Sequence, residues 1–374
     1  MTHDLLESLD DPMPYDPPAD LTETSRARGR RLRRRRRLGI TGAAIPIVVV
    51  LALVAGVVYI DRRTAGVARV DAAAGVLSPV AAGAPYNILV VGFGTPVSGP
   101  DATDSPQFIG PYGFSQSSDT MVVVRIDPAA GRITLLSLPR DLVFAGATSL
   151  DDRLSDVQPR SGVSGLITTI RDHLGIDIAH FVEVDFQGFS RLINAAGGIS
   201  IQASTPLRDA NTGMTLDTSC QKLDGIQTLG LVRARHIEYQ LNGRWTPDPL
   251  GGLGRMDQQR VVLSLLVTQL SQLPNDLVTV NRLLDVFVEN TAIDSGLSRQ
   301  AVLDLGRWGR TLQPGAVESE TLPVMTERLA DGADMLTPTA DAPAAVASFT
   351  RGELTPTATP TVATAPPPFS IAGC

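Results

Sequence analysis

Short apolar runs and polar turn sequences alternate from residue 86 onward, a pattern that predicts β-strands. Tyr86–Val91 is a continuous apolar run of the kind found in buried strands. Two β-branched runs, Thr120–Ile126 and Ile133–Leu138, lie on either side of the turn sequence Asp-Pro-Ala-Ala-Gly, which predicts an antiparallel hairpin. Further strands are expected at 180–185, 199–201 and 230–236.

Helical periodicity is found in four other segments. Apolar residues recur at helical spacing in 165–174, 186–196, 256–273 and 297–309. The pair Gly197-Gly198, directly after the second of these, is a typical helix stop signal. Strands and helices follow one another without a strict βαβ order. We therefore expect an α+β fold of three layers, α/β/α, with a central mixed sheet flanked by helices.

The first 60 residues differ sharply from the rest in charge. Residues 1–25 contain seven acidic residues, four prolines and no Lys or Arg, whereas residues 26–37 contain nine arginines. Residues 38–60 then form a run of 23 residues without a charge, long enough for a helix that spans a bilayer. Because positive charge stays on the cytoplasmic side, we expect 1–37 to be a disordered cytoplasmic tail and 38–60 a single transmembrane helix.

This topology places the protein in the cell membrane with its C-terminal part outside the cytoplasm. Two other interpretations of the same stretch remain open: a nucleic-acid-binding arginine arm and a cleaved signal peptide, although the apolar run is longer than signal peptides usually have. The exported part, 61–374, holds 23 basic and 32 acidic residues, so no nucleic-acid partner is expected.

Two weakly charged segments flank the predicted domain at 86–350. Residues 61–85 are rich in Ala, Gly and Val and are expected to form a juxtamembrane stalk or a packed first helix. Residues 351–374 form a Thr/Pro-rich tail. The chain has only two cysteines, Cys220 and Cys374, which excludes a zinc site built from cysteines. Outside the cytoplasm they are free to pair, and the sequence leaves open whether they do.

Arginines on four separate segments are the candidate functional residues. Arg140 follows the predicted hairpin, Arg233 and Arg235 lie on one face of the predicted strand 230–236, and Arg255 opens a long helix. Each has an ordinary structural interpretation, as a surface ion pair or a solvated strand face. If they converge, they form a site for a dense anion, because the planar guanidinium binds phosphate oxygens in a bidentate manner.

Five stretches of the chain, in their order and spacing, resemble the LytR-CpsA-Psr (LCP) family of cell-envelope glycopolymer ligases. They read NILVVGFG (87–94), SSDTMVVVRIDPAAGRITLLSLPRDLVF (117–144), HFVEVDFQGFSRLINAAGGISI (180–201), LDGIQTLGLVRARH (223–236) and GRMDQQRVVLSLL (254–266). The resemblance implies a transferase that takes a glycan from a polyprenyl-pyrophosphate carrier and attaches it to peptidoglycan as a phosphodiester. It also implies a long apolar pocket for the polyprenyl tail.

The same resemblance implies roles for individual residues. Arg140 matches the arginine of the PRD motif, and Arg233 and Arg235 match the VRxR pair, all with catalytic roles at the pyrophosphate. Asp119 matches the acid of the SDTM motif, which in the family helps to hold Mg²⁺ (or Mn²⁺). The substrate-binding matches are Arg153, Arg255 and Gln259. Asp141 is expected to be mainly structural and to orient Arg140.

The sequence departs from the family pattern at one chemically important position. The family usually has an acid two residues after the glycine that follows the first strand, and this chain has Gly94 there. Asp101 and Asp104, in the following loop, are candidates for replacing it. The final motif reads RMDQQR instead of RxxRQQ, which makes Gln259 a weaker match. An alternative is therefore a non-catalytic relative that binds or scaffolds polyprenyl-pyrophosphate lipids. A third, transcription regulation, rests only on the arginine run.

Overall fold

The structure is a computed structural model that describes most of the chain from residue 68 onward. The described residues are 68–72, 75–93, 118–146, 152–249, 252–272, 282–283, 285–287, 291–313, 315–328, 334–354 and 369–374. The predicted tail 1–37 and transmembrane helix 38–60 lie outside these residues. Within the described ranges, no helix combines the length and the apolar character needed to cross a bilayer.

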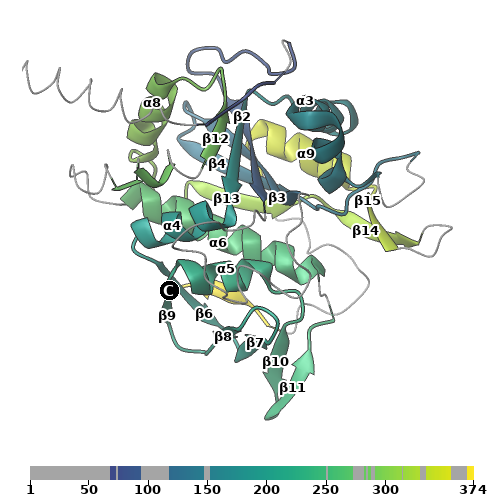
Figure 1. Cartoon of the computed structure of the whole chain (residues 1–374), viewed down its shortest axis with the longest axis vertical. Helices are drawn as coiled ribbons and strands as arrows, with labels where there is room; N and C mark the ends of the chain where they lie inside the picture. Colours follow the sequence, from purple (N-terminus) through teal and green to yellow (C-terminus); the bar gives the residue numbers. More distant parts are fainter. Residues whose placement is uncertain are drawn as a thin grey trace, which may run out of the picture. The chain divides into compact units, whose positions relative to one another are not determined.

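A seven-stranded mixed sheet forms the centre of the fold (Figure 1). In spatial order its strands are β1 (Ala68–Val70), β12 (Thr291–Asp294), β5 (His180–Asp185), β2 (Tyr86–Phe93), β3 (Ser118–Asp127), β4 (Arg132–Leu138) and β13 (Val317–Thr321). β1–β12, β2–β5 and β4–β13 are parallel pairs, and the other neighbours are antiparallel. The predicted β3–β4 hairpin and the mixed sheet are therefore confirmed.

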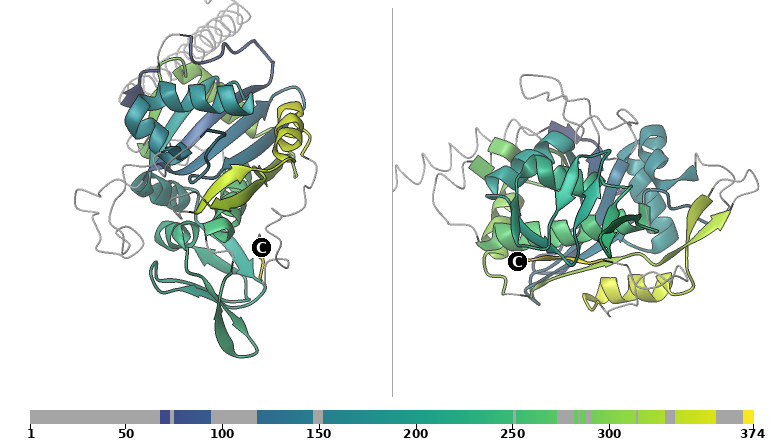
Figure 2. Two further views of the ribbon diagram at one scale, coloured as in Figure 1. Left: turned by 90° about the vertical axis from the view of Figure 1, so that its right-hand side faces the viewer. Right: turned by 90° about the horizontal axis from the view of Figure 1, so that it is seen from below.

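Helices cover both faces of this sheet, so the predicted three layers are confirmed as well (Figure 2). α3 (Leu154–Leu174) and α9 (Ala342–Arg351) share one core with alternate residues of the strands, among them Leu89, Met121 and Phe181. α6 (Gly252–Gln272) and α8 (Arg299–Gly309) pack on the other face, against Ile88 and Val122. Strand side chains alternate between the two faces of the sheet, and helices cover both faces. Nearly every strand position is therefore buried, which explains why the strand sequences are nearly continuous apolar runs.

A second group of elements lies beyond one end of the sheet. It contains α4 (Phe186–Ala195), α5 (Gly225–Arg233), and the three-stranded sheet of β16 (Ile371–Gly373), β6 (Ile199–Ala203) and β9 (Gln221–Leu223). A four-stranded sheet, β11 (Arg244–Pro247), β10 (Glu238–Leu241), β7 (Leu207–Asp209) and β8 (Met214–Leu216), completes it. Separately, β14 (Val324–Arg328) and β15 (Asp334–Pro338) form a two-stranded ribbon.

The folded part extends beyond the predicted domain 86–350 on both sides. β1 lies in the predicted stalk 61–85 yet pairs with β12, and Arg69 donates to the carbonyl oxygens of Asp294 and Leu297 at 2.9 and 3.0 Å. β16 lies in the predicted tail 351–374 yet pairs with β6. Neither strand has more than three residues, so neither leaves a period that a sequence pattern could reveal.

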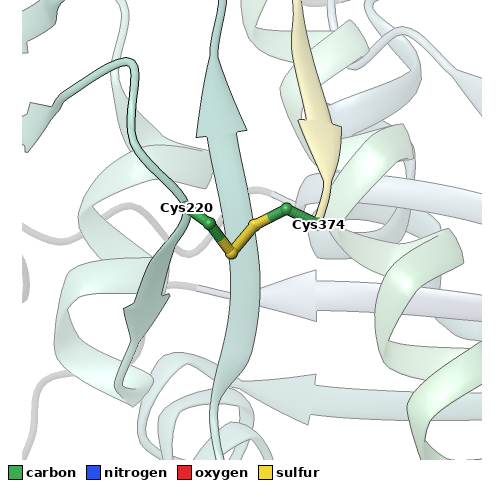
Figure 3. The surroundings of a disulfide bond; sticks show 2 residues. All are labelled: Cys220 and Cys374. Carbon is green, nitrogen blue, oxygen red and sulfur yellow. A yellow bond between two sulfur atoms is a disulfide. The ribbon is translucent and has the colours of Figure 1, made fainter.

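The two cysteines form a disulfide, which the sequence left open. The sulfur atoms of Cys220 and Cys374 are bonded, and the Cα atoms are 5.8 Å apart. Cys220 directly precedes β9 and Cys374 directly follows β16, and β6 lies between these two strands (Figure 3). The bond therefore fastens the last described segment across the three-stranded sheet.

The predicted strand at 230–236 is wrong, because most of it belongs to helix α5. Asp224 and Gln227 form a capping box at the start of this helix, in which each side chain bonds to the backbone of the other residue. Gly225 lies so close to the backbone of Ser190 that no side chain would fit there. The helix ends at Arg233, and Ala234 is already extended. Arg233 and Arg235 therefore do not share the face of a strand.

Candidate functional site

Arg140 and Arg153 are joined by one carboxylate at the start of α3. An oxygen of Asp141 lies 3.4 Å from Nε of Arg140 and 3.7 Å from Nη1 of Arg153. Arg153 is the N-cap residue of α3, and its Nε also donates to Asp156 at 2.9 Å. The backbone carbonyl of Arg140 accepts the amide hydrogen of Ser155 at 3.0 Å. The helix start thus fixes both arginines, and Asp141 contacts Arg140 as expected of an orienting residue.

Arg233 and Arg235 are placed by the end of α5. The guanidinium carbon of Arg233 lies 4.6 Å from the ring centroid of Phe186, the first residue of α4. A guanidinium stacked on an aromatic ring keeps its edge available for hydrogen bonds. Phe186 directly follows β5, so this contact places Arg233 at the carboxyl end of that strand.

Asp209 fixes Arg235 and was not recognised in the sequence. It ends β7, is 1% exposed, and its Oδ2 accepts the amide hydrogens of Arg235 and His236, each at 2.9 Å. Its Oδ1 accepts those of Asn211 and Thr212 at 2.8 and 3.3 Å. In the sequence this residue is one acid in a turn, and only the tertiary fold shows that it holds the VRxR segment. Its carboxylate thus holds the backbone that carries Arg235.

We expect Asp209→Asn to misplace Arg235. An amide keeps one acceptor oxygen but turns a donor toward two of the four amide hydrogens, which leaves them unpaired at a cost of about 1–3 kcal/mol. The rate of the glycan transfer that the family resemblance implies should fall at least tenfold. Asp217→Asn, an exposed control in the same region, should leave this rate unchanged. Initial rates and the urea midpoint, measured together, separate misplacement from unfolding. Unchanged activity in a folded variant would remove Asp209 from the site.

α6 contributes Arg255 and Gln259 with different roles. Arg255 is only 5% exposed and lies in the first turns of the helix. Gln259 donates from Nε2 to the carbonyl oxygen of Val232 at 3.0 Å, so its amide holds the end of α5. Gln259, which was predicted to bind substrate, therefore also makes a contact that supports the end of α5.

The start of β3 contains an irregularity at the predicted metal ligand. Gly92 pairs with Thr120 and Phe93 with Ser118, which leaves Asp119 as the extra residue of a bulge. The side chain of Asp119 lies outside the described part of the structure, as do Gly94, Asp101 and Asp104. Within the described part, no three His, Cys, Asp or Glu side chains are grouped to hold a metal ion.

A second acid, Glu183, lies near the same end of the sheet and was also missed. Ser118 donates to Gln158 at 3.4 Å, and Gln158 donates to Glu183 at 3.3 Å, which connects β3 to β5 through α3. Burial, with a smaller contribution from the charge of Asp185, raises the pKa of Glu183, although the bond from Gln158 opposes this. In the sequence Glu183 is one polar position inside a strand, so nothing distinguishes it.

Strand register brings these groups to one end of the sheet. Phe93 pairs with both Ser118 and Asp185, and Met121 pairs with Leu138, so β2, β4 and β5 end where β3 begins. The Arg140–Arg153 pair follows β4, and Arg233 stacks at the end of β5. The result is an arginine end of the sheet, at which guanidinium groups from separate elements can hold a polyanion.

A model of the LytR_cpsA_psr family matches residues 57–349, which is most of the chain. The chain belongs to the LytR_cpsA_psr family. The matched span contains the whole central sheet. Every arginine of the candidate site also lies within it, so the site is built from family segments and not from an addition specific to this chain.

Relatives within the family agree in fold and differ in how much of the chain they cover. The polyisoprenyl-teichoic acid–peptidoglycan teichoic acid transferase TagU of Enterococcus faecalis is 29% identical over 178 residues, 47% of this chain and 54% of that protein. The chain thus spans about half the length of the curated relatives it matches. The structure of a LytR-Csp2A-Psr enzyme from Actinomyces oris matches with a TM-score of 0.59 and 26% identity, over 78% of this chain and 97% of that one.

The fold extends to more distant LytR_cpsA_psr structures. TagV of Bacillus subtilis matches with a TM-score of 0.56 and 20% identity, over 74% of this chain and 100% of that one. This likeness concerns the fold alone. It supports the three-layer arrangement as the common frame of the LytR_cpsA_psr family, on which individual sites are placed.

Proposed function

We propose that this protein is a membrane-anchored phosphotransferase that moves a glycopolymer from a polyprenyl-pyrophosphate carrier onto peptidoglycan. The observation that carries the proposal is the arginine end of the sheet, where Asp141 joins Arg140 to Arg153 and Phe186 supports Arg233. A pyrophosphate concentrates negative charge, and arginines held in place by their neighbours stabilise such charge without reorganising. The relative from E. faecalis is named as a transferase of this type.

The proposed reaction is a phosphoryl transfer with a defined balance of bonds. A hydroxyl oxygen of the acceptor attacks the phosphorus next to the sugar, and the bond from that phosphorus to the bridging oxygen breaks. Polyprenyl monophosphate leaves, and the glycan phosphate becomes a phosphodiester. The acceptor proton goes to a base. Glu183, whose pKa is raised by burial, is the described acid that we propose for this step in place of the acid missing at position 94.

Two parts of the proposal rest on the family resemblance alone. The described residues supply no metal cluster, so a Mg²⁺ or Mn²⁺ ion would take Asp119 as its ligand from the protein and oxygens of the pyrophosphate as the others. The second part that rests on the resemblance is the apolar pocket for the polyprenyl tail. A cavity of about 650 Å³ lies between the segment before β2 and α8, at the end of the sheet opposite the arginines.

The test is the release of polyprenyl phosphate by the full chain in detergent or nanodiscs, from a short-chain polyprenyl-pyrophosphate glycan. We expect release with Mg²⁺, loss of release with EDTA, and loss in Arg140→Ala. Arg171→Ala is the matched control, because Arg171 is partly exposed at the far end of α3 and forms an ion pair with its neighbour Asp172. Tight binding without release, whatever the metal, would contradict the proposal and support the lipid-binding alternative.

A further inference from the structure

The side-chain carbonyl of Gln258 is a buried hydrogen-bond acceptor without a donor. Gln258 belongs to α6 and is only 2% exposed. Its oxygen Oε1 is shielded from solvent and accepts no hydrogen bond from the residues that the structure describes. An unpaired buried acceptor destabilises the folded state, so such groups are rare in native proteins. This atom therefore calls for an explanation other than the packing of α6.

Two other glutamines of α6 have bonded amides. Nε2 of Gln259 donates to the carbonyl oxygen of Val232 at 3.0 Å, and Nε2 of Gln269 donates to that of Ala196 at 2.8 Å. Both side chains are only partly buried. Gln258 is buried more deeply than either, yet its carbonyl oxygen has no partner among the described residues. Packing of this helix against α5 and α4 thus does not by itself leave a glutamine unpaired.

Helical spacing places Gln258 beside the arginine end of the sheet. Arg255 lies one turn before it and Val262 one turn after it, so the three share a face of α6. This face is buried, with Arg255 at 5% and Val262 at 1% exposure. Val262 belongs to the same core as Leu231 of α5, two residues before Arg233. Gln258 therefore lies where α6 meets the end of α5 that carries Arg233.

The parts of the proposed donor substrate differ in what they can offer to Oε1. The prenyl chain has no polar hydrogen. The pyrophosphate is ionised at neutral pH, so its oxygens accept hydrogen bonds and donate none. The glycan carries hydroxyl groups, each of which has one hydrogen to donate. Among these three parts, only the glycan can satisfy the unpaired oxygen.

We propose that Gln258 is a specificity-determining residue whose Oε1 accepts a hydrogen bond from a hydroxyl of the sugar next to the bound pyrophosphate. The inference rests on the proposed function, because it assigns the sugar of that same donor. The terminal torsion of a glutamine turns at little cost, so Oε1 can meet a hydroxyl on the Arg255 side of the helix. The family pattern RxxRQQ has an arginine at this position, which makes the contact a property of this chain.

The contact divides recognition of the donor between two kinds of side chain. The arginines hold the phosphate groups, which every polyprenyl-pyrophosphate glycan has. Gln258 contacts the sugar, which differs from one glycan to another. A donor without the matching hydroxyl leaves Oε1 unpaired and is therefore rejected.

In Gln258→Met, stability and donor affinity should change in opposite directions. Methionine is unbranched and of similar size, and it removes the unpaired acceptor, so the urea midpoint of the unliganded full chain in detergent should rise. By calorimetry, the variant should bind a short-chain polyprenyl-pyrophosphate glycan about tenfold more weakly. Its affinity for farnesyl pyrophosphate, which has the phosphates but no sugar, should equal that of the wild type.

Gln269→Met is the matched control, with the same substitution on the same helix. The amide of Gln269 is already bonded to Ala196, so its loss should lower the urea midpoint. Both affinities should stay at the wild-type values.

A series of modified donors tests the contact on the wild-type chain and does not depend on the folding of a variant. In each member, one hydroxyl of the first sugar is replaced by hydrogen. One member should bind the wild type about tenfold more weakly than the parent donor does. Gln258→Met should bind this member and the parent equally, because the bond that the modification removes is already absent.

The results that overturn the inference can be told apart. Equal weakening of both lipids in Gln258→Met would assign the residue to the phosphates. Unchanged affinities would refute the sugar contact, and a lowered urea midpoint would then assign Oε1 to a structural water. A change confined to the KM of the acceptor would move the contact to the acceptor glycan. A wild-type chain that binds neither lipid would refute the proposed function itself.

Discussion

Arg233→Ala should lower the release of polyprenyl phosphate by about 100- to 1,000-fold, the loss seen when one fixed donor to a developing oxyanion is removed. The reason is geometric, because Arg233 is held at 4.6 Å over the ring of Phe186 and its replacement removes this guanidinium from the end of β5. Arg233→Lys should recover little, since an ammonium cannot reproduce the planar fork. Initial rates at saturating and limiting substrate would show whether kcat falls.

Two further variants separate the site from general effects of losing an arginine. Phe186→Leu keeps Arg233 but removes its support, so an intermediate loss is expected. Arg208→Ala is a control for the loss of a stacked arginine, because Arg208 of β7 also stacks on an aromatic ring, that of Trp245 of β11 at 4.2 Å, and pairs with Glu238 of β10. Wild-type rates in a folded Arg233→Ala protein would show that the arginine end of the sheet is not where the chemistry occurs.

Asp294→Asn should cost about 3–5 kcal/mol of stability, the second large effect. Asp294 is fully buried, and its carboxylate accepts from the amides of Phe181, Gly296 and Leu297 at 2.8–3.0 Å. It also lies 3.2 Å from Nδ1 of His180, so it ties β12 to β5 and to the start of α8. The side-chain amide of asparagine would replace one acceptor oxygen by an NH₂ group, which cannot accept the hydrogen bonds that this oxygen receives.

The pH dependence of this effect has a defined sign. Burial alone would raise the pKa of Asp294, but the hydrogen bonds from His180 and from the amides of Phe181 and Leu297 outweigh it and hold the pKa below the ordinary 3.8. A lowered pKa stabilises the folded state above the unfolded-state pKa and stops doing so as the pH falls through the folded-state value. The difference in urea unfolding between wild type and Asp294→Asn should therefore be full at neutral pH and shrink below about pH 4.

An exposed acid provides the control for this measurement. Asp172→Asn changes a carboxylate that is 58% exposed, and its effect should be within experimental error at either pH. A pH-independent loss in Asp294→Asn would mean that shape, not charge, makes Asp294 necessary.

Local patterns predicted the parts of the fold that local sequence determines. The β3–β4 hairpin followed from two β-branched runs around a proline–glycine turn, and α4 from its periodicity and its terminal glycines. The end of α5 could not be predicted in this way. Its Leu-Val-Arg-Ala-Arg sequence alternates like a strand, and the capping box at Asp224 and Gln227 that starts the helix was not recognised.

The sequence predicted several residues of the candidate site, but not the contacts that hold them in place. Arg140, Arg153 and Arg233 were found because their motifs lie at segment ends that the resemblance identifies. Asp209 and Glu183 could not be found, because each is an ordinary acid until the fold brings Arg235 or Gln158 to it. Contacts between residues that are 25 or more positions apart leave no trace in a single sequence.

The disulfide between Cys220 and Cys374 also determines how the protein will respond to proteases. The two cysteines are 154 positions apart, and the covalent loop between them includes α6, β12 and α8. A single cleavage anywhere in this loop leaves both fragments linked, so a nicked chain runs as one species on a non-reducing gel and as two after reduction. A cut before Cys220, in contrast, produces two fragments that no disulfide joins, because the chain has only these two cysteines.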